Sequence, residues 1–130
     1  MREREDLTGC RILIVEDRYL IATELAEEVA RLGAEVIGPA RDVAAALALV
    51  ADQPPSLALL DVNLDGELVF PLAENLAARH ARFIFLTGYD DDVLPAAWRD
   101  APRLQKPIDP KALRREFFRL ADGWAQDSHM

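Results

Sequence analysis

The residue types that could do chemistry in this chain stand at the ends of short apolar runs. They are three acidic residues, a threonine followed by glycine, and a lysine followed by proline: Glu16, Asp17, Asp61, Thr87, Gly88, Lys106 and Pro107. Carboxylates a few ångströms apart repel one another by about 4 kcal/mol per pair at an effective dielectric of roughly 20. Three ionised carboxylates held together therefore require a cation. Because hard oxygen ligands favour Mg²⁺, the pattern predicts a magnesium site.

The segments between these residues alternate in the manner of an α/β protein. Short apolar runs predict five strands, at 11–15, 35–38, 57–61, 82–87 and 103–105. Apolar residues at every third or fourth position predict five helices, at 19–32, 43–51, 69–81, 92–99 and 110–123. This alternation predicts a doubly wound parallel sheet of the flavodoxin-like order 2-1-3-4-5. In such a sheet, the acidic residues, the threonine and the lysine named above lie together at the carboxyl ends of the strands. We expect the fourth helix to be short or mobile because it contains Pro95.

Composition and charge argue against several classes of partner and several cellular locations. Fifteen Lys and Arg against 23 Asp and Glu give a net charge of -8, which argues against binding to nucleic acid or to an anionic membrane. The single cysteine, Cys10, allows no disulfide within the chain and fits a reducing compartment. The sequence shows no signal peptide and no membrane span. We expect a cytoplasmic protein with one domain over 10–124 and tails at 1–9 and 125–130.

The residues at the strand ends resemble, in their order, those of receiver domains of two-component response regulators. The likeness covers nearly the whole chain and rests on four short segments: Glu16–Asp17, Leu59–Asn63, Phe85–Gly88 and Lys106–Pro107. It implies that Asp61 accepts a phosphoryl group from the histidine of a sensor kinase or of a phosphotransfer protein. It also implies that Mg²⁺ is bound by Asp17 and Asp61, by Glu16 through water, and by the backbone carbonyl of Asn63. The phosphorylated protein would then change its binding to an unidentified downstream protein.

The other strand-end residues fit the same chemistry. The charge of a phosphoryl group in transfer spreads over its equatorial oxygens, so the protein mainly positions groups and neutralises charge. Lys106 would supply positive charge, and Thr87 would donate a hydrogen bond to a phosphoryl oxygen. Gly88 would leave space and a bare backbone amide beside it. The resemblance also suggests that the Lys106–Pro107 peptide bond is cis.

One position departs from the family pattern. Most receivers carry an aromatic switch residue three positions before the lysine, where this chain has Arg103. A guanidinium is costly to bury without a partner. We therefore expect that Arg103 does not swing inward and that the segment 89–100, which contains Asp90–Asp92, responds to phosphorylation instead.

The segment Phe85–Tyr89 resembles the FAT GUY receiver subgroup, which is known from alphaproteobacteria and is often paired with HWE-type kinases. Leu86 stands where that nickname has Ala.

Similar residues occur in other kinds of site. The segment Asp61–Gly66 matches the opening of an EF-hand loop, but the twelfth position is Leu72 instead of Glu. Phosphohydrolases of the haloacid-dehalogenase type also combine an aspartate nucleophile with Mg²⁺, and here Asn63 replaces the second acid of their D-x-D motif. Taken alone, Glu16–Asp17 could be a solvated turn that caps the next helix. We expect a receiver without an attached effector domain, and no enzyme activity beyond its own phosphorylation and dephosphorylation.

Overall fold

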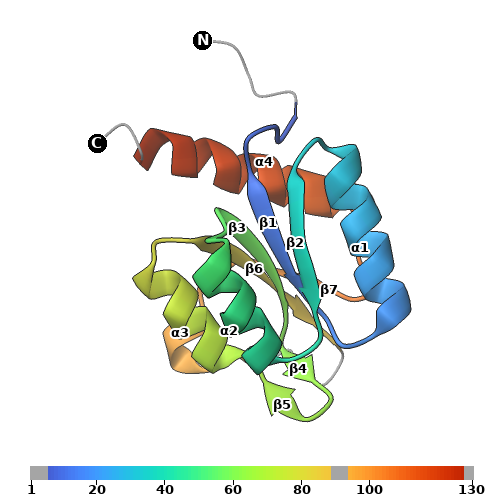
Figure 1. Ribbon diagram of the computed structural model, residues 1–130, viewed down its shortest axis with the longest axis vertical. Helices are drawn as coiled ribbons and strands as arrows, with labels where there is room; N and C mark the ends of the chain where they lie inside the picture. The colour runs from blue at the N-terminus through green and yellow to red at the C-terminus, as the bar shows by residue number, and fades with distance from the viewer. Residues whose placement is uncertain (1–5, 89–93, 128–130) are drawn as a thin grey trace.

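The computed structural model describes residues 6–88 and 94–127, with side chains as far as residue 121. Its centre is a five-stranded sheet in which all neighbouring strands are parallel, in the order β2-β1-β3-β6-β7 (Figure 1). The strands are β1 (Arg11–Val15), β2 (Glu35–Ala40), β3 (Leu57–Asp61), β6 (Arg82–Thr87) and β7 (Arg103–Gln105). Counted among themselves, these strands have the order 2-1-3-4-5. The predicted doubly wound, flavodoxin-like fold is confirmed.

Four α-helices flank the sheet in the described part of the chain. They are α1 (Tyr19–Arg31), α2 (Val43–Asp52), α3 (Phe70–Ala78) and α4 (Pro110–Asp127). The Asp42 carboxylate caps α2 by accepting a hydrogen bond from the Ala45 N–H at 2.8 Å. Asp109 likewise accepts from the Lys111 N–H at 3.0 Å, just before Pro110 opens α4. α3 ends three residues earlier than predicted, whereas α4 continues past residue 123.

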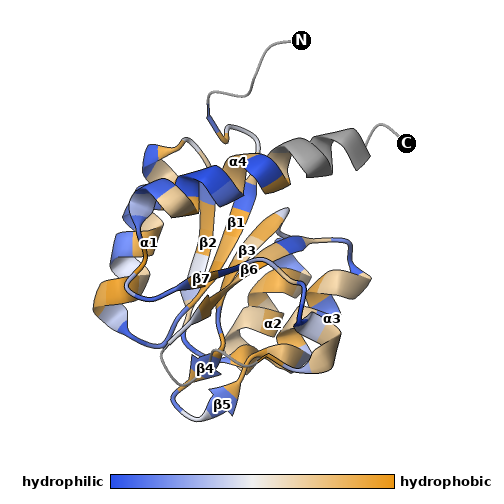
Figure 2. Cartoon of the chain, turned by 180° about the vertical axis from the view of Figure 1, so that it is seen from behind, coloured by the Kyte–Doolittle hydropathy of each residue, from blue (hydrophilic) through white to orange (hydrophobic). Residues whose placement is uncertain are grey.

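Alternation of side chains along the strands divides the core into two layers. Leu13, Val15 and Leu60 pack on one side of the sheet, in the cluster that includes residues of α2 and α3. Their neighbours Ile12 and Ile14 pack on the other side, with residues of α1 and α4. Figure 2 shows the hydrophobic colour on the central strands and hydrophilic stretches along α4 and in parts of α1. Because helices cover both faces, the central strands are continuous apolar runs.

The segment predicted as a fourth helix, 92–99, is not an α-helix where the structure describes it. Residues Ala96–Trp98 form a single 3-10 turn that begins after Pro95. Proline cannot supply a backbone N–H and disfavours the helical conformation of the residue before it, so a helix of eight residues cannot run through it. The count of five helices is therefore wrong for the described residues. Tyr89 and Asp90–Asp92 lie outside them.

A small hairpin that the sequence analysis did not predict follows β3. Its strands β4 (Asn63–Leu64) and β5 (Glu67–Leu68) are antiparallel and are joined by the dipeptide Asp65–Gly66. Both turn residues have positive φ, 54° and 95°, which is the requirement of a two-residue type I′ turn and the reason that Asp-Gly suits it. The hairpin places Leu68 on the surface, where it is 52% exposed.

Leu7, near the start of the described residues, and Ala121, the last residue with a described side chain, pack in the same layer of the core. Leu7 is fully buried in the layer beside α1 and α4, and its N–H donates to the Leu32 carbonyl at 2.8 Å. At least this residue of the predicted tail 1–9 therefore packs with the domain.

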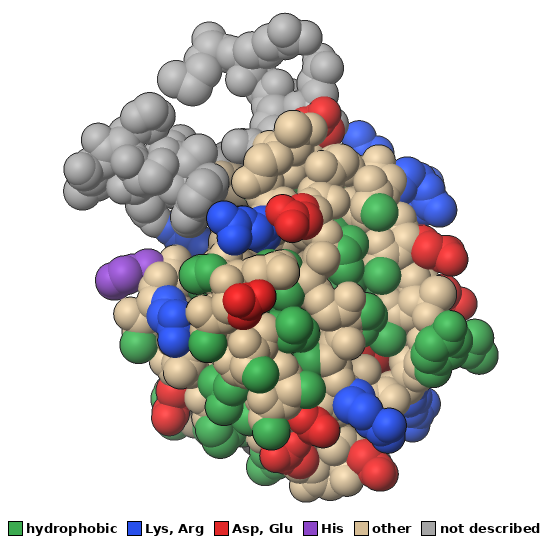
Figure 3. Space-filling view, viewed as in Figure 1, with side chains coloured by type: hydrophobic (Ala, Val, Ile, Leu, Met, Phe, Trp, Pro, Cys, Tyr) green, Lys and Arg blue, Asp and Glu red, His purple; other side chains and the backbone are tan. Residues whose placement is uncertain are grey.

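On the face seen in Figure 3, charged side chains of both signs are scattered among apolar ones. In the described residues, no helix combines the length and the apolar character needed to cross a bilayer.

Candidate phosphoacceptor site

The register of the sheet brings the strand-end residues together. Val15 pairs with Leu60, so Glu16, the next residue after β1, lies beside Asp61 at the end of β3. Asp61 in turn pairs with Leu86, which places Thr87 one residue further along β6. Thr87 pairs with Gln105, and Lys106 follows directly. Parallel pairing thus aligns the ends of four strands, and each contributes its next polar side chain to the same edge.

Three carboxylates and one ammonium form the centre of this edge. Glu16, Asp17 and Asp61 each offer an oxygen, and the three oxygens lie within 4.8 Å of one another. Lys106 Nζ lies 2.9 Å from Glu16 Oε2 and 3.3 Å from Asp61 Oδ2. Both contacts are ion pairs. The cluster therefore holds three acidic groups against one basic group, and both Glu16 and Asp61 are nearly inaccessible to solvent.

The electrostatics of this cluster act chiefly on Asp61. Burial raises the pKa of the Asp61 carboxyl, and the charge of Glu16 raises it further, to about 7 from an ordinary 3.8. Lys106 opposes this rise in pKa but does not cancel it. For Lys106, burial lowers the pKa of the ammonium, yet its contacts with Glu16 and Asp61 outweigh burial and the net shift is upward. The cluster is thus short of positive charge, and the carboxylate of Asp61 is the group that a cation would stabilise.

Thr87 brings an unsatisfied hydroxyl to the same edge. Its side chain is fully buried, and its Oγ1 has no hydrogen-bond partner among the described residues. A buried hydroxyl without a partner costs free energy that a suitable acceptor recovers. The Thr87 carbonyl accepts from the Lys106 N–H at 2.8 Å, which ties β6 to the residue that bears the ammonium. Gly88 follows and is half-buried, and the Lys106–Pro107 peptide bond is cis.

Glu16 and Asn63 each have a second role in the local backbone. Glu16 Oε1 accepts a hydrogen bond from the Arg18 N–H at 3.2 Å, immediately before α1. This bond orders the turn before α1, but it does not cap the helix, because Arg18 is itself the N-cap residue and no side chain caps α1. The other carboxylate oxygen of Glu16 faces Lys106. The Asn63 side-chain oxygen accepts from the Gly66 N–H at 2.6 Å, and the Asn63 N–H donates to Asp61 Oδ1 at 3.4 Å. Asn63 thus links the hairpin turn to the central aspartate.

Arg103 is directed toward the 3-10 turn in this structure. It pairs with Phe85 in the sheet, and its Nη2 donates to the Arg99 carbonyl at 2.6 Å. Arg99 closes the turn, so the guanidinium satisfies a carbonyl at the end of that turn. This contact gives the charged side chain a polar partner at the position where most receivers have an aromatic ring.

An aromatic cluster connects the same turn to the sheet. The ring of Trp98 lies 5.5 Å from that of Phe83 and 6.0 Å from that of Phe85, both edge-on. Phe85 in turn meets Phe70 of α3 at 5.6 Å. The sequence analysis did not identify this cluster, although Phe83 and Phe85 stand two apart in a strand and therefore share a face. Its member nearest to the site along β6, Phe85, lies two residues before Thr87.

Glu67 is a second residue that the sequence analysis missed. From the hairpin, its Oε1 accepts a hydrogen bond from the Val43 N–H at 3.1 Å, the first residue of α2. A carboxylate is stabilised at a helix N-terminus by the unpaired N–H groups and by the helix dipole. The hairpin that follows Asp61 is therefore tied to α2. The Asp-Gly turn could have predicted the hairpin, but no local signal identifies a contact across 24 positions.

A model of the response regulator receiver domain family matches residues 12–117. The chain belongs to this family. The match includes every strand-end residue named above. Receivers are signalling domains and not enzymes in the ordinary sense, and phosphorylation and magnesium binding are typical of them. The chain is thus a phosphorylation-regulated signalling receiver, and its strand-end cluster is the candidate site of that regulation.

Relatives and solved structures agree with this membership. The chain is 37% identical over 109 residues to the sensory transduction protein LytT of Bacillus subtilis, covering 81% of this chain and 45% of LytT. It is 31% identical over 101 residues to the transcriptional regulatory protein PdtaR of Mycobacterium tuberculosis, covering 77% of this chain and 49% of PdtaR. The chain thus spans about half the length of these relatives.

Among solved structures, SdrG from Sphingomonas melonis Fr1 matches with a TM-score of 0.77 and 42% identity, covering 86% of this chain and 96% of SdrG. The receiver domain of PhyR from Erythrobacter litoralis matches with a TM-score of 0.78 and 28% identity, covering 88% of this chain and 91% of that domain. These likenesses are consistent with the resemblance of Phe85–Tyr89 to the FAT GUY subgroup.

Proposed function

We propose that Asp61 is the phosphoacceptor and that a phosphohistidine of a sensor kinase or of a phosphotransfer protein is the donor. The observation that carries the proposal is the position of the Asp61 carboxylate. It ends a central strand, 3.3 Å from the Lys106 ammonium, and lies within 4.8 Å of carboxylate oxygens of Glu16 and Asp17. These surroundings favour a phosphoacceptor role for Asp61 over a purely structural ion pair, because the charge of one lysine cannot balance the charges of three carboxylates.

In the transfer, an Asp61 carboxylate oxygen attacks phosphorus as the bond from phosphorus to the donor imidazole nitrogen breaks. The electron pair of that bond stays on the imidazole, and the product is the aspartyl phosphate. Lys106 neutralises charge on the phosphoryl oxygens, and the Thr87 hydroxyl finds in one of them the acceptor that it otherwise lacks. The protein's task is positioning and charge neutralisation, for which rigid strand ends are suited.

A magnesium ion fits the donor set of this edge. Its three carboxylates match the oxygen ligands that Mg²⁺ prefers. Burial and the charge of Glu16 raise the pKa of Asp61, and a bound cation would oppose that rise. Asp17 and Asp61 would hold the ion directly, Glu16 through water, and the Asn63 backbone carbonyl would complete the protein ligands. When bound, the ion supplies positive charge to the phosphoryl oxygens and lets Asp61 ionise near neutral pH.

The downstream step we propose is a change in binding to a partner protein. The likeness to SdrG and to the PhyR receiver, together with Phe85–Tyr89, supports an HWE-type kinase as the donor. Membership of the receiver family does not favour the haloacid-dehalogenase alternative. Asn63 argues against it as well, because a neutral carboxamide has no proton acidic enough to act as the general acid that the second acidic residue of D-x-D supplies.

Labelling with a small phosphodonor tests the proposed acceptor. Incubation with phosphoramidate and Mg²⁺ should add one phosphoryl group, measured by intact mass, and Asp61→Asn should abolish the addition. The matched control is Asp65→Asn, which changes an exposed aspartate in the hairpin turn. Its left-handed conformation is one that asparagine tolerates. Labelling of Asp61→Asn at the wild-type level, or sustained hydrolysis of p-nitrophenyl phosphate, would refute the proposal.

A further inference from the structure

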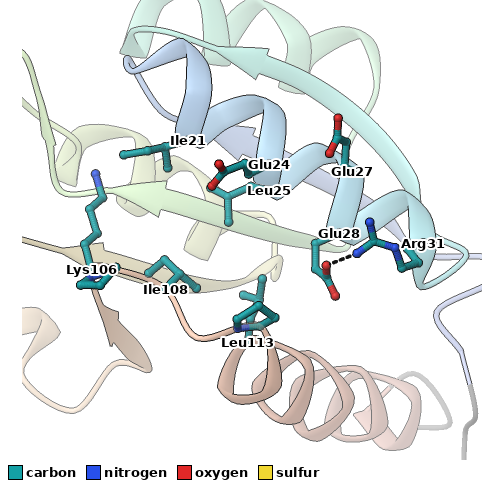
Figure 4. Close-up of a pocket in the computed structure, with 11 residues that line it drawn as sticks. Ile21, Glu24, Leu25, Glu27, Glu28, Arg31, Lys106, Ile108 and Leu113 are labelled. Atoms are coloured by element: carbon teal, nitrogen blue, oxygen red, sulfur yellow. Dashed lines mark hydrogen bonds and ion pairs between the residues drawn. The ribbon is translucent and has the colours of Figure 1, made fainter.

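The hairpin of β4 and β5 borders the edge of the sheet that carries Asp61. Lys106 reaches this edge from the side of α1, where it lines a groove between α1 and the segment 106–113 (Figure 4). The hairpin lies on the other side, at the start of α2 (Figure 1), and its Leu64 is buried in the layer of α2 and α3. It begins two residues after Asp61, so its backbone determines which groups face this carboxylate.

The pairing of the hairpin fixes which backbone groups of Asn63 face Asp61. The Val69 N–H donates to the Val62 carbonyl at 3.1 Å, so these two residues form a hydrogen-bonded pair. The two kinds of pair alternate along an antiparallel ladder, so the backbone groups of the next pair, Asn63 with Leu68, face away from the partner strand. The Asn63 N–H accordingly donates to Asp61 Oδ1 at 3.4 Å. The carbonyl of a strand residue points to the same side as its N–H, so the Asn63 carbonyl is also directed out of the hairpin.

The side toward which this carbonyl points depends on the register of the hairpin. A shift of one residue would exchange the two kinds of pair and turn the Asn63 carbonyl toward β5. The bond from the Gly66 N–H to the Asn63 side chain, 2.6 Å long, holds the turn together internally. An isolated pair of strands is nevertheless only marginally stable in water, and these strands are very short. The register therefore depends on contacts with the rest of the protein.

Leu64 and Glu67, which are partners across the hairpin, make such contacts. Leu64 anchors β4 by its burial in the core, and Glu67 anchors β5 to α2. The Glu67 carboxylate accepts from the N–H of Val43, which is itself buried in the same core layer as Leu64. Asp42 caps a different amide of α2, that of Ala45. The helix thus has its own N-cap, and what Glu67 adds is the connection to the hairpin.

We propose that Glu67 is a positioning residue for the magnesium site. By joining β5 to α2, it holds the hairpin in the register that directs the Asn63 carbonyl out of the hairpin, on the side of its N–H and Asp61. This inference rests on the proposed function, because it takes the Asn63 carbonyl as a magnesium ligand. Glu67 acts through the hairpin and not on the phosphoryl group. Its removal should therefore weaken Mg²⁺ binding and leave the labelling rate at saturating Mg²⁺ unchanged.

Titration of the full chain with MgCl₂ at constant ionic strength, followed by amide NMR, tests this role. Glu67→Ala should weaken Mg²⁺ binding by roughly tenfold, as is usual for residues that orient the ligands of a metal. Glu67→Gln keeps an oxygen that can accept from the Val43 N–H, so its Mg²⁺ affinity should be close to that of the wild type. In phosphoramidate labelling, Glu67→Ala should need more Mg²⁺ for the half-maximal rate but reach the wild-type rate at saturation.

The matched control is Asp42→Ala, which removes the other carboxylate at the start of α2. It should lower stability to a similar extent but leave the Mg²⁺ affinity at the wild-type value, because Asp42 caps α2 itself and not the hairpin. Wild-type affinity in Glu67→Ala, or equal weakening by Asp42→Ala or by Glu67→Gln, would overturn the inference and leave the magnesium site intact. Absence of Mg²⁺ binding by the wild type would refute the magnesium site, and the inference with it.

Discussion

The two halves of the carboxyl edge are built on different principles. At β1 and β3, the polar residues continue straight from buried strands, so sheet register alone brings Glu16 beside Asp61. Register also places Thr87 at the end of β6 and Lys106 after β7, so these strand ends form one half together with Glu16 and Asp61. The second half is the 3-10 turn beside them, where side-chain contacts such as Arg103 with the Arg99 carbonyl and Trp98 with Phe83 add to the backbone hydrogen bonds of the turn. We infer that the first half carries the chemistry and that the second is where a change of state costs least.

Removing the ammonium from the rigid half should have the largest effect. Lys106→Met leaves the carboxylates of Glu16 and Asp61 without their counter-charge in a nearly buried site. We expect a loss of about 2 kcal/mol in the free energy of unfolding without metal, less at millimolar Mg²⁺, and slower labelling by phosphoramidate. Urea denaturation with and without Mg²⁺ measures the first two effects. An unchanged midpoint would mean that the three carboxylates do not repel in the folded protein.

The pH dependence of stability tests the same half. The pKa of Asp61 is about 7 in the folded protein against 3.8 ordinarily, so the folded state binds the proton more tightly than the unfolded state. The resulting stability is complete below about pH 4 and is lost as the pH rises through about 7. Asp61→Asn removes this loss and should be more stable than the wild type at pH 8 without metal, by on the order of 2 kcal/mol. Parallel stability curves for the two proteins across this pH range would contradict the argument.

The contact between the hairpin and α2 predicts a smaller effect. Glu67→Ala removes the carboxylate that accepts from the Val43 N–H and should cost about 1 kcal/mol, the usual value of a helix-capping interaction. Chemical denaturation measures it. Glu74→Ala, which removes an exposed glutamate from α3, is the matched control and should have little effect on stability. If the two variants lose equal stability, Glu67 makes no net contribution to tying the hairpin to α2.

The smallest effect on stability, but a visible spectroscopic one, is expected in the second half. Arg103→Ala should cost less than about 1 kcal/mol, because the guanidinium is partly exposed and its hydrogen bond to the Arg99 carbonyl lies at the surface. It should nevertheless shift the emission of Trp98, measured in a Trp124→Phe background. Arg99→Ala keeps the backbone carbonyl and serves as the control. Identical emission of both variants would show that the guanidinium does not position the turn.

Hydrogen exchange with beryllofluoride as the phosphoryl mimic extends this test to the switch. We predict that protection changes in residues 89–100 and not around Arg103, because the described part of this segment is a short 3-10 turn, whereas Arg103 lies in a strand of the sheet. A change of protection confined to Arg103 and its strand would show that this side chain moves as an aromatic switch residue does. The 3-10 turn would then take no part in the response to phosphorylation.

The contrast between the halves also marks what a sequence can predict. Buried strands are continuous apolar runs, so the residues after them, Glu16, Asp61, Thr87 and Lys106, could be placed at one edge from the sequence alone. Pro95 was recognised as a helix breaker, yet a 3-10 turn stabilised by Trp98 depends on packing that no local pattern specifies. Glu67 acts across a distance in sequence that only the folded chain reveals. Local sequence patterns therefore predicted the strands and the residues at their ends, whereas the individual side-chain contacts could be identified only in the structure.

The most direct test of the central claim is to locate the phosphoryl group on the chain. An aspartyl phosphate can be reduced with borohydride to homoserine, which tandem mass spectrometry places at a single residue. After treatment with phosphoramidate, we predict homoserine at position 61, dependent on Mg²⁺ and lost when Asp17→Ala removes a proposed ligand. Homoserine at Asp17 or Asp65 with none at position 61, or labelling of Asp61 that is the same without any divalent ion, would contradict the account.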